Sequence, residues 1–140
     1  MAALDTNVVV RLLVGDDAAQ ARAAEKLVAS EPCTVAPSVL MECEWVLRGA
    51  YALDAQTIDA SLRGLLALKN IRPADAVLTQ RTLDAYSAGV DFADALHAAQ
   101  CPDGERFATF DKTFAKRAAK AGLLLLLMCY YWDLISRTAQ

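Results

Sequence analysis

The sequence predicts an α/β fold in which a short parallel sheet is covered by helices, giving three α/β/α layers. Short apolar segments alternate along the chain with longer amphipathic segments, which is typical of strand–helix–strand units. Such units join strands by right-handed crossovers and therefore form parallel sheets with helices on both faces. The 140 residues fit a single domain, because no low-complexity linker or internal repeat divides them.

The individual elements follow from apolar periodicity and from residues that cap or stop helices. Apolar runs predict strands over residues 2–4, 33–36, 70–73, 106–110 and 123–127. Helical spacing predicts helices over residues 8–13, 17–28, 38–49, 55–68, 75–89, 91–99 and 112–121, with Asn7 and Ser38 among the caps. The Val8–Val10 run also favours a strand by propensity, so the first helix has an alternative.

Composition limits the classes of protein to consider. Cys33, Cys43, Cys101 and Cys129 lack metal-ligand spacing and are interpreted as reduced thiols of a cytoplasmic protein. The N-terminus has no basic region before an apolar run, so no signal peptide is expected. The net charge of −3 gives no general attraction for nucleic acid. A polyanionic substrate would therefore need a local basic patch or a metal ion.

Two acids stand at the start of one apolar helix. Asp91 and Asp94 are three residues apart, and no basic residue lies beside them. Asp91 suits an N-cap, and Asp94 falls in the first turn, where the helix dipole favours an anion. The helix is apolar almost all round and should be largely buried. The Asp94 carboxylate therefore needs a counter-charge, which a bound metal ion would supply.

Three more acids follow other predicted strands. Asp5 ends the first strand, Asp111 ends the fourth, and Glu42 lies on an apolar stripe of the helix after the second strand. Glu44 competes with Glu42, and periodicity does not separate the two. Because ligands bind beyond the carboxyl ends of parallel strands, we expect Asp5, Glu42, Asp94 and Asp111 to meet at one edge of the sheet.

Four carboxylates in one pocket favour a particular chemistry. Two carboxylates about 4 Å apart repel by about 4 kcal/mol at an effective dielectric of about 20, so the group should raise pKa values or bind a cation. Ligation by carboxylates without cysteine or histidine indicates Mg²⁺ or Mn²⁺ rather than zinc. Such an ion activates water and neutralises a scissile phosphate, which makes phosphodiester hydrolysis the natural reaction.

The acidic motifs also resemble those of a known family. The matching segments are Leu4-Asp5-Thr6-Asn7, Glu42 with Trp45-Val46-Leu47, Asp91-Phe92-Ala93-Asp94-Ala95-Leu96, and Thr109-Phe110-Asp111. Over almost its whole length the chain resembles a PIN domain, specifically the VapC-type toxin ribonucleases of bacterial toxin–antitoxin pairs. Each motif alone is short enough to occur by chance, but the four together, in order, are specific.

The resemblance implies a function and a site. It implies endonucleolytic cleavage of RNA by a Mg²⁺-dependent enzyme, with Mn²⁺ as a substitute, an antitoxin protein as partner and a homodimer as the form. It also implies that Asp5, Glu42, Asp94 and Asp111 form the acidic metal-binding pocket. Glu42 is preferred over Glu44, because the glutamate of the family stands three residues before the tryptophan.

Several polar residues beside these acids have two interpretations. Thr6, Asn7 and Thr109 suit contact with a phosphate oxygen or support of an acid, but each is also an ordinary cap or strand residue. His97 stands three residues after Asp94, although a lone histidine on an apolar helix is more often packed than catalytic.

The helix after Asp111 carries a run of cations. Lys112, Lys116 and Lys120 share one face at a spacing of four residues. Such a run is usually a solvated face. Because this helix follows Asp111 directly, Lys112 and Lys116 are also the best local candidates for phosphate contact.

The C-terminus departs from the family pattern. Residues 123–140 begin with the apolar run LLLLLMCYYW, which is far shorter than the about 20 residues of a membrane span. We expect Leu123–Leu127 to be a buried strand. Tyr130–Ile135 should pack against a second subunit or the antitoxin, since contiguous exposed apolar surface usually marks an interface. The alternative is that this segment folds back over a helix of its own chain.

Two other functions remain as alternatives. A PIN-like module could bind RNA or protein without cutting, but loss of one of the acids would be expected in that case. A metal-dependent phosphatase of small molecules would need a closed pocket, whereas RNA cleavage needs an open groove.

Overall fold

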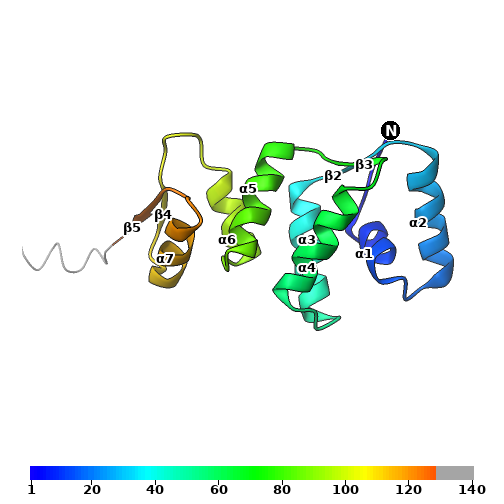
Figure 1. Ribbon diagram of the computed structural model, residues 1–140, viewed down its shortest axis with the longest axis horizontal. Coiled ribbons are helices and arrows are strands. Elements are labelled where there is room, and N and C mark those ends of the chain that lie inside the picture. The colour runs from blue at the N-terminus through cyan, green and yellow to red at the C-terminus, as the bar shows by residue number, and fades with distance from the viewer. Residues whose placement is uncertain (129–140) are drawn as a thin grey trace, which may run out of the picture.

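The computed structural model describes residues 1–128 and confirms the α/β class (Figure 1). The helices are α1 (Thr6–Val14), α2 (Ala18–Ser30), α3 (Pro37–Gly49), α4 (Ala55–Leu66), α5 (Ala76–Ser87), α6 (Phe92–Ala99) and α7 (Lys112–Lys120). The strands are β1 (Ala2–Ala3), β2 (Cys33–Val35), β3 (Ile71–Pro73), β4 (Phe107–Thr109) and β5 (Leu125–Leu127). The order of elements is the predicted one and is consistent with a three-layer α/β/α fold.

The strands of the described residues form two parallel sheets rather than one. The first sheet has the order β1-β2-β3, and the second consists of β4 and β5. In the second sheet Phe107 pairs with Leu125 and Thr109 with Leu127. Figure 1 shows β4, β5 and α7 at the opposite end of the molecule from α1 and α2. Local patterns predict where strands lie but not which strands pair, so the sequence did not indicate this division.

Most of the buried apolar surface lies in residues 1–99, here called the N-terminal body. Its core contains Val9 of α1, Leu40 and Leu47 of α3, and Ile58 and Leu62 of α4. All five side chains are almost completely inaccessible to solvent. α3 and α4 are therefore tightly packed on their inner faces and provide a rigid support for residues on their outer surfaces.

Residues 107–127, here called the C-terminal unit, pack through a much smaller contact. Phe114 and Ala118 of α7 lie against Ala95 and Ala98 of α6. Among residues 1–128, no helix is both long and apolar enough to span a membrane.

The apolar run that begins the C-terminal segment forms a strand, but the strand is less buried than predicted. β5 covers Leu125–Leu127, whereas Leu124 and Leu127 are exposed, because β5 is at the edge of a two-stranded sheet. Tyr130–Ile135 lie outside the described residues, so the predicted interface there stays a prediction.

Two helix starts differ from the predicted ones. α1 begins at Thr6 with Asp5 in the N-cap position, so Asn7 lies inside the helix instead of capping it. α3 begins at Pro37 rather than after Ser38, since proline suits the first helical position, where a backbone N–H has no partner. The first difference affects the candidate site, because it places Asp5 at the junction of β1 and α1.

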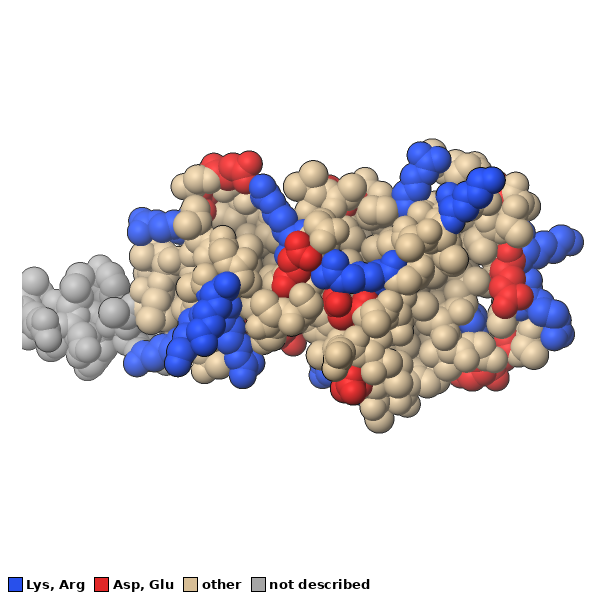
Figure 2. Space-filling model, in the orientation of Figure 1, with Lys and Arg blue, Asp and Glu red and all other residues tan. Residues whose placement is uncertain are grey.

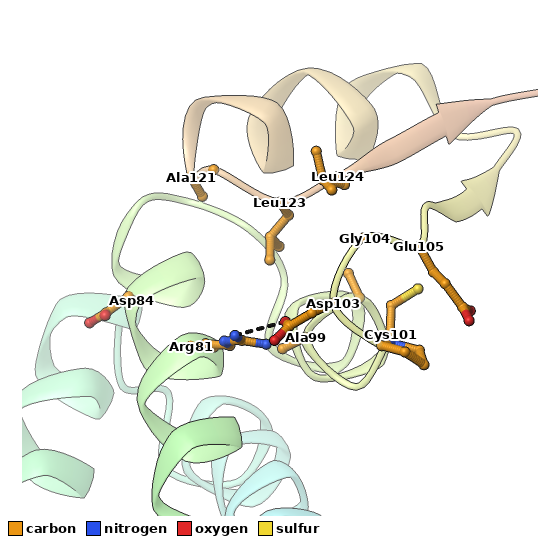
Figure 3. Close-up of a pocket in the computed structure, with 13 residues that line it drawn as sticks. Arg81, Asp84, Ala99, Cys101, Asp103, Gly104, Glu105, Ala121, Leu123 and Leu124 are labelled. Carbon is orange, nitrogen blue, oxygen red and sulfur yellow. Dashed lines mark hydrogen bonds and ion pairs between the residues drawn. The ribbon is translucent and has the colours of Figure 1, made fainter.

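A hollow of about 280 Å³ lies where the C-terminal unit meets α5 and α6 (Figure 3). Arg81 of α5 and Asp103 form an ion pair of 2.9 Å there, and Leu123 approaches from the other side. None of the four predicted acids lines this hollow. The hollow is therefore part of the junction and not of the candidate site.

Candidate functional site

Asp5 has a carboxylate that the helix does not use. Although Asp5 occupies the N-cap position of α1, its side chain accepts no capping hydrogen bond. Each of the five other aspartates in N-cap positions accepts a bond from a backbone N–H group; they are Asp17, Asp54, Asp75, Asp91 and Asp111. The Asp5 side chain is exposed at the carboxyl end of β1 and is available for a ligand.

Thr6 links Asp5 to Glu42. The Thr6 hydroxyl is buried and donates a hydrogen bond of 2.9 Å to Oε2 of Glu42, which fixes that carboxylate beside the start of α1. Burial, followed by the negative charges of Glu42 and Asp5, raises the pKa of the Cys43 thiol to about 12. Because Thr6 follows Asp5 directly in the chain, its bond to Glu42 brings both acids to the start of α1. Thr6 therefore supports an acid, which is one of the roles expected for it from the sequence.

The structure separates Glu42 from Glu44 by their surroundings. Glu44 is only 4% exposed and accepts bonds from Arg48 Nε at 2.8 Å and from the Tyr86 hydroxyl at 3.2 Å. Burial and the nearby Glu44 charge raise the pKa of Tyr86. Glu44 thus joins α3 to α5, whereas Glu42 is exposed. The predicted apolar stripe at Glu42 was wrong, since the buried face of α3 runs through Leu40, Cys43, Glu44 and Leu47.

Asp94 lies near two other acids. Its pKa is raised first by burial and then by the negative charges of Asp91 and Asp111, while His97 acts in the opposite direction. Asp91 accepts bonds from the backbone N–H groups of Ala93 and Asp94, so its predicted role as a cap is confirmed. Asp94 is thus the half-buried acid of α6, set in the unfavourable electrostatic surroundings that the sequence predicted.

Asp111 joins this second group from the C-terminal unit. Its carboxylate accepts a bond of 2.9 Å from the Phe114 N–H and caps α7. Its own backbone N–H donates to the Thr109 hydroxyl at 3.0 Å, which fixes the turn between β4 and α7. Thr109 therefore positions Asp111 through the backbone.

The four predicted acids stand as two pairs. Thr6 joins Asp5 and Glu42 within the N-terminal body, whereas the charge of Asp111, in the C-terminal unit, contributes after burial and Asp91 to the raised pKa of Asp94. Within residues 1–128, no three His, Cys, Asp or Glu side chains converge as a metal-binding group. The expectation that all four acids meet at one edge of one sheet is not met here, because β4 pairs with β5 and not with β1.

The donor chemistry nevertheless suits a hard divalent cation. Every donor of the two pairs is a carboxylate oxygen, and burial followed by like charge raises the pKa of Asp94, a penalty that a bound cation would relieve. Asp5 and Glu42 on one side, and Asp94 and Asp111 on the other, are the residues that would hold Mg²⁺ or Mn²⁺.

A second hollow, of about 490 Å³, adjoins Glu42. It lies between α3 and the start of α6 and is lined by Ser38, Met41, Glu42, Glu44, Trp45, Arg48, Asp91 and Ala93. The indole of Trp45 is 66% exposed there. Sequence reasoning used Trp45 only to choose between the glutamates. The spacing of three residues from Glu42 could have indicated that both side chains share one side of the helix.

A basic surface covers the end of the molecule formed by α7 (Figure 2). Lys112, Lys116, Arg117 and Lys120 are all exposed on this helix. Phe114 and Ala118 occupy its buried face, so the charges are turned outward. Because Asp111 caps the same helix, these cations adjoin one of the acid pairs, as predicted for Lys112 and Lys116.

Comparison with protein families decides what kind of domain this is. The family model described as the PIN domain matches residues 2–120. The chain belongs to the PIN domain family. PIN domains are generally nucleases, so membership supports a hydrolase that acts on nucleic acid. The match ends before β5. Comparisons with curated proteins and with solved structures give no match.

Proposed function

We propose that this PIN domain is a metal-dependent endoribonuclease and the toxin of a type II toxin–antitoxin pair. The observation that carries the proposal is the acid set: Asp5, Glu42, Asp94 and Asp111 are all present, on motifs that match the family in order. Asp5 is free of any capping bond, and Thr6 holds Glu42 in place beside it. Neither the Asp5 nor the Glu42 carboxylate caps a helix, and both are exposed, which supports a functional role.

The residues of the chain would share the work as follows. The carboxylates would hold a divalent ion, whose chemistry when bound would be to activate a water and neutralise phosphate charge. Thr6 keeps the Glu42 carboxylate oriented through its hydrogen bond. Thr109 fixes the turn that carries Asp111. The cations of α7 attract the RNA backbone toward this end of the molecule.

RNA is a better fit than a small phosphorylated molecule. The hollow beside Glu42 is bordered by a largely exposed tryptophan, and the cations of α7 are spread over an outer surface instead of enclosing a pocket. An open, partly basic surface suits a long polyanion. A phosphatase would need its cations gathered around one enclosed site.

A cleavage assay tests the proposal directly. The full chain is incubated with structured RNAs in Mg²⁺, in Mn²⁺ and in EDTA. Cleavage is expected with either metal, with loss in EDTA and in Asp5→Asn. Asp17→Asn is the matched control, because Asp17 caps α2 with its side chain and belongs to neither acid pair. RNA that is bound but not cut under every condition would favour the non-catalytic binding module.

The proposed partners require a separate test. An antitoxin that covers the acidic site should inhibit cleavage when the two proteins are produced together, and sedimentation of the toxin alone should show a homodimer. Truncation after Leu127 should shift that dimer toward monomer or aggregate. A truncated protein that remains a well-behaved dimer would overturn the role expected for the tail.

A further inference from the structure

Trp45 is exposed where a tryptophan is not needed for folding. α3 buries Leu40, Cys43, Glu44 and Leu47 against the body, and Trp45 projects from the opposite side of the helix. Most large aromatic side chains are highly buried, so an indole that is 66% exposed beside a hollow is unusual. Its position three residues after Glu42 brings it next to one of the acid pairs.

The surroundings of Trp45 hold the helix and a nearby cation in fixed positions. The Arg48 guanidinium donates to Glu44 at 2.8 Å, and Glu44 is in turn held by the Tyr86 hydroxyl. Hydrogen bonding and charge attraction to Glu44 raise the pKa of Arg48, so this side chain is always charged. A flat indole and a cation thus line the same hollow.

We propose that Trp45 is a stacking platform for one nucleobase of single-stranded RNA, next to the phosphate that is cleaved. Every base has an aromatic face, so an exposed ring binds a single strand without demanding a particular sequence. Glu44 holds Nε of Arg48, and the other guanidinium N–H groups of Arg48, in the same hollow, would donate to the adjoining phosphate. This inference rests on the proposed function and specifies how the substrate is positioned.

A protein partner fits this hollow less well. Glu42 and Asp91 line it together with Trp45. A protein segment packed over the hollow would remove both carboxylates from water, and burial of unpaired charge is costly. A base that stacks on the indole covers the apolar ring alone and leaves the acids free to hold a metal ion.

Binding measurements on the full chain test the platform. All variants carry Asp5→Asn, which prevents cleavage. They also carry Trp132→Phe, which removes the other of the two tryptophans in the sequence and leaves Trp45 as the single indole. A single-stranded RNA of about 12 nucleotides, within the usual range of site sizes, is titrated in Mg²⁺. The fluorescence of Trp45 should be quenched as RNA binds.

Substitutions separate stacking from simple apolar contact. Trp45→Ala and Trp45→Leu should weaken binding roughly 5- to 150-fold, the effect of losing one base stacked on an aromatic ring. Trp45→Phe should retain most of the affinity. The matched control is Val77→Ala on α5, which removes another exposed apolar side chain that does not line the hollow.

The outcomes distinguish this inference from the proposed function. If the wild-type chain cleaves RNA and Trp45→Leu cleaves with an unchanged KM, the platform is wrong and the proposed function stands. If the wild-type chain cuts no RNA with either metal, the proposed function fails instead. A Trp45→Ala variant that loses its oligomeric state in sedimentation but binds RNA normally would show a protein interface, and would also overturn the platform.

Discussion

The N-terminal body and the C-terminal unit are built from the same kinds of element but are held together very differently. The body has a sheet of three strands and a continuous core from α1 to α6. In the C-terminal unit, α7 buries only Phe114 and Ala118, and its sheet has two strands. One acid pair lies wholly in the body, whereas the other depends on contact between the two regions. The chemistry of Asp111 is therefore coupled to a small and weak packing contact.

Removing one phenylalanine from each region should show this difference most strongly. Phe92 is buried in the body and packs edge-to-face against Tyr86, with 5.2 Å between the ring centroids. Phe114 packs in the same way against Phe107 in the C-terminal unit, with 6.1 Å between the ring centroids. Phe92→Ala should lower the free energy of unfolding of the whole body by about 3–5 kcal/mol.

Phe114→Ala should instead loosen only the C-terminal unit. Hydrogen exchange should speed up in residues 107–127 and remain slow in α3 and α4. RNA cleavage should also fall, because Asp111 is carried by the loosened unit. Equal exchange throughout the Phe114→Ala chain would mean that the two regions unfold as one.

Substitution of the predicted acids should have the next largest effect, which is a loss of RNA cleavage. Asp5→Asn, Asp94→Asn and Asp111→Asn should each lower cleavage by more than about 100-fold, since even residues that only support metal ligands cost about 10–100-fold when changed. The fold should persist, because asparagine can still cap α7 at position 111. Steady-state kinetics and circular dichroism measure the two effects. Loss of folded structure in all three variants would show that the acids are structural.

The order of elements could be predicted from the sequence, and the pairing of strands could not. The cap Asp91 was predicted correctly, because a cap is a local hydrogen bond between near neighbours, whereas Asn7 and Ser38 do not cap their helices. The pairing of β4 with β5 depends on contacts distant in sequence. The sequence therefore identified the acids without showing that they would stand as two pairs.

The two glutamates of α3 illustrate the same limit on a smaller scale. Glu42 and Glu44 both adjoin apolar residues, so periodicity left them equivalent. The bonds from Arg48 and Tyr86 that distinguish Glu44 require α5 and the end of α3 to be in place.

Changing each glutamate should sharpen this distinction. Glu44→Gln should lower the free energy of unfolding by about 1–3 kcal/mol, because a buried charged acceptor is replaced by a neutral one. Glu42→Gln should change stability by less than about 0.5 kcal/mol, as exposed substitutions usually do, but should strongly weaken Mn²⁺ binding and cleavage. Urea denaturation and metal titration measure these effects. Equal losses of metal binding in the two variants would overturn the assignment of Glu42.

The lysines of α7 should have smaller, graded effects. Lys112→Ala and Lys116→Ala should each weaken RNA binding a few-fold and reduce the slope of log affinity against log salt by about 0.7, the value for one phosphate contact on a single strand. Lys26→Ala on α2 is the matched control, since it removes an exposed lysine from the other region. An unchanged salt slope in both α7 variants would mean that this face is only solvated.

Besides its effect on cleavage, Asp94→Asn should have a small effect on stability, which is a pH-dependent gain in the absence of metal. Its pKa in the folded chain is raised above the ordinary value of 3.8, so protonation favours the folded state and stability falls as pH rises above that value. Asparagine does not titrate. In EDTA, Asp94→Asn should therefore be more stable than wild type at pH 7, by less than about 1 kcal/mol after solvent screening, and the gain should vanish in acid.

Asp54 supplies the control of opposite sign for this measurement. Hydrogen bonds from the Thr57 N–H lower the Asp54 pKa, so its stabilising effect is present above 3.8 and is lost as pH falls. Asp54→Asn should therefore lose stability at pH 7 relative to wild type, with no loss in acid. Thermal melts of both variants between pH 3 and 7 measure the two trends. An Asp94→Asn gain that is the same at both ends of this range would mean that the pKa of Asp94 is not raised in the folded chain.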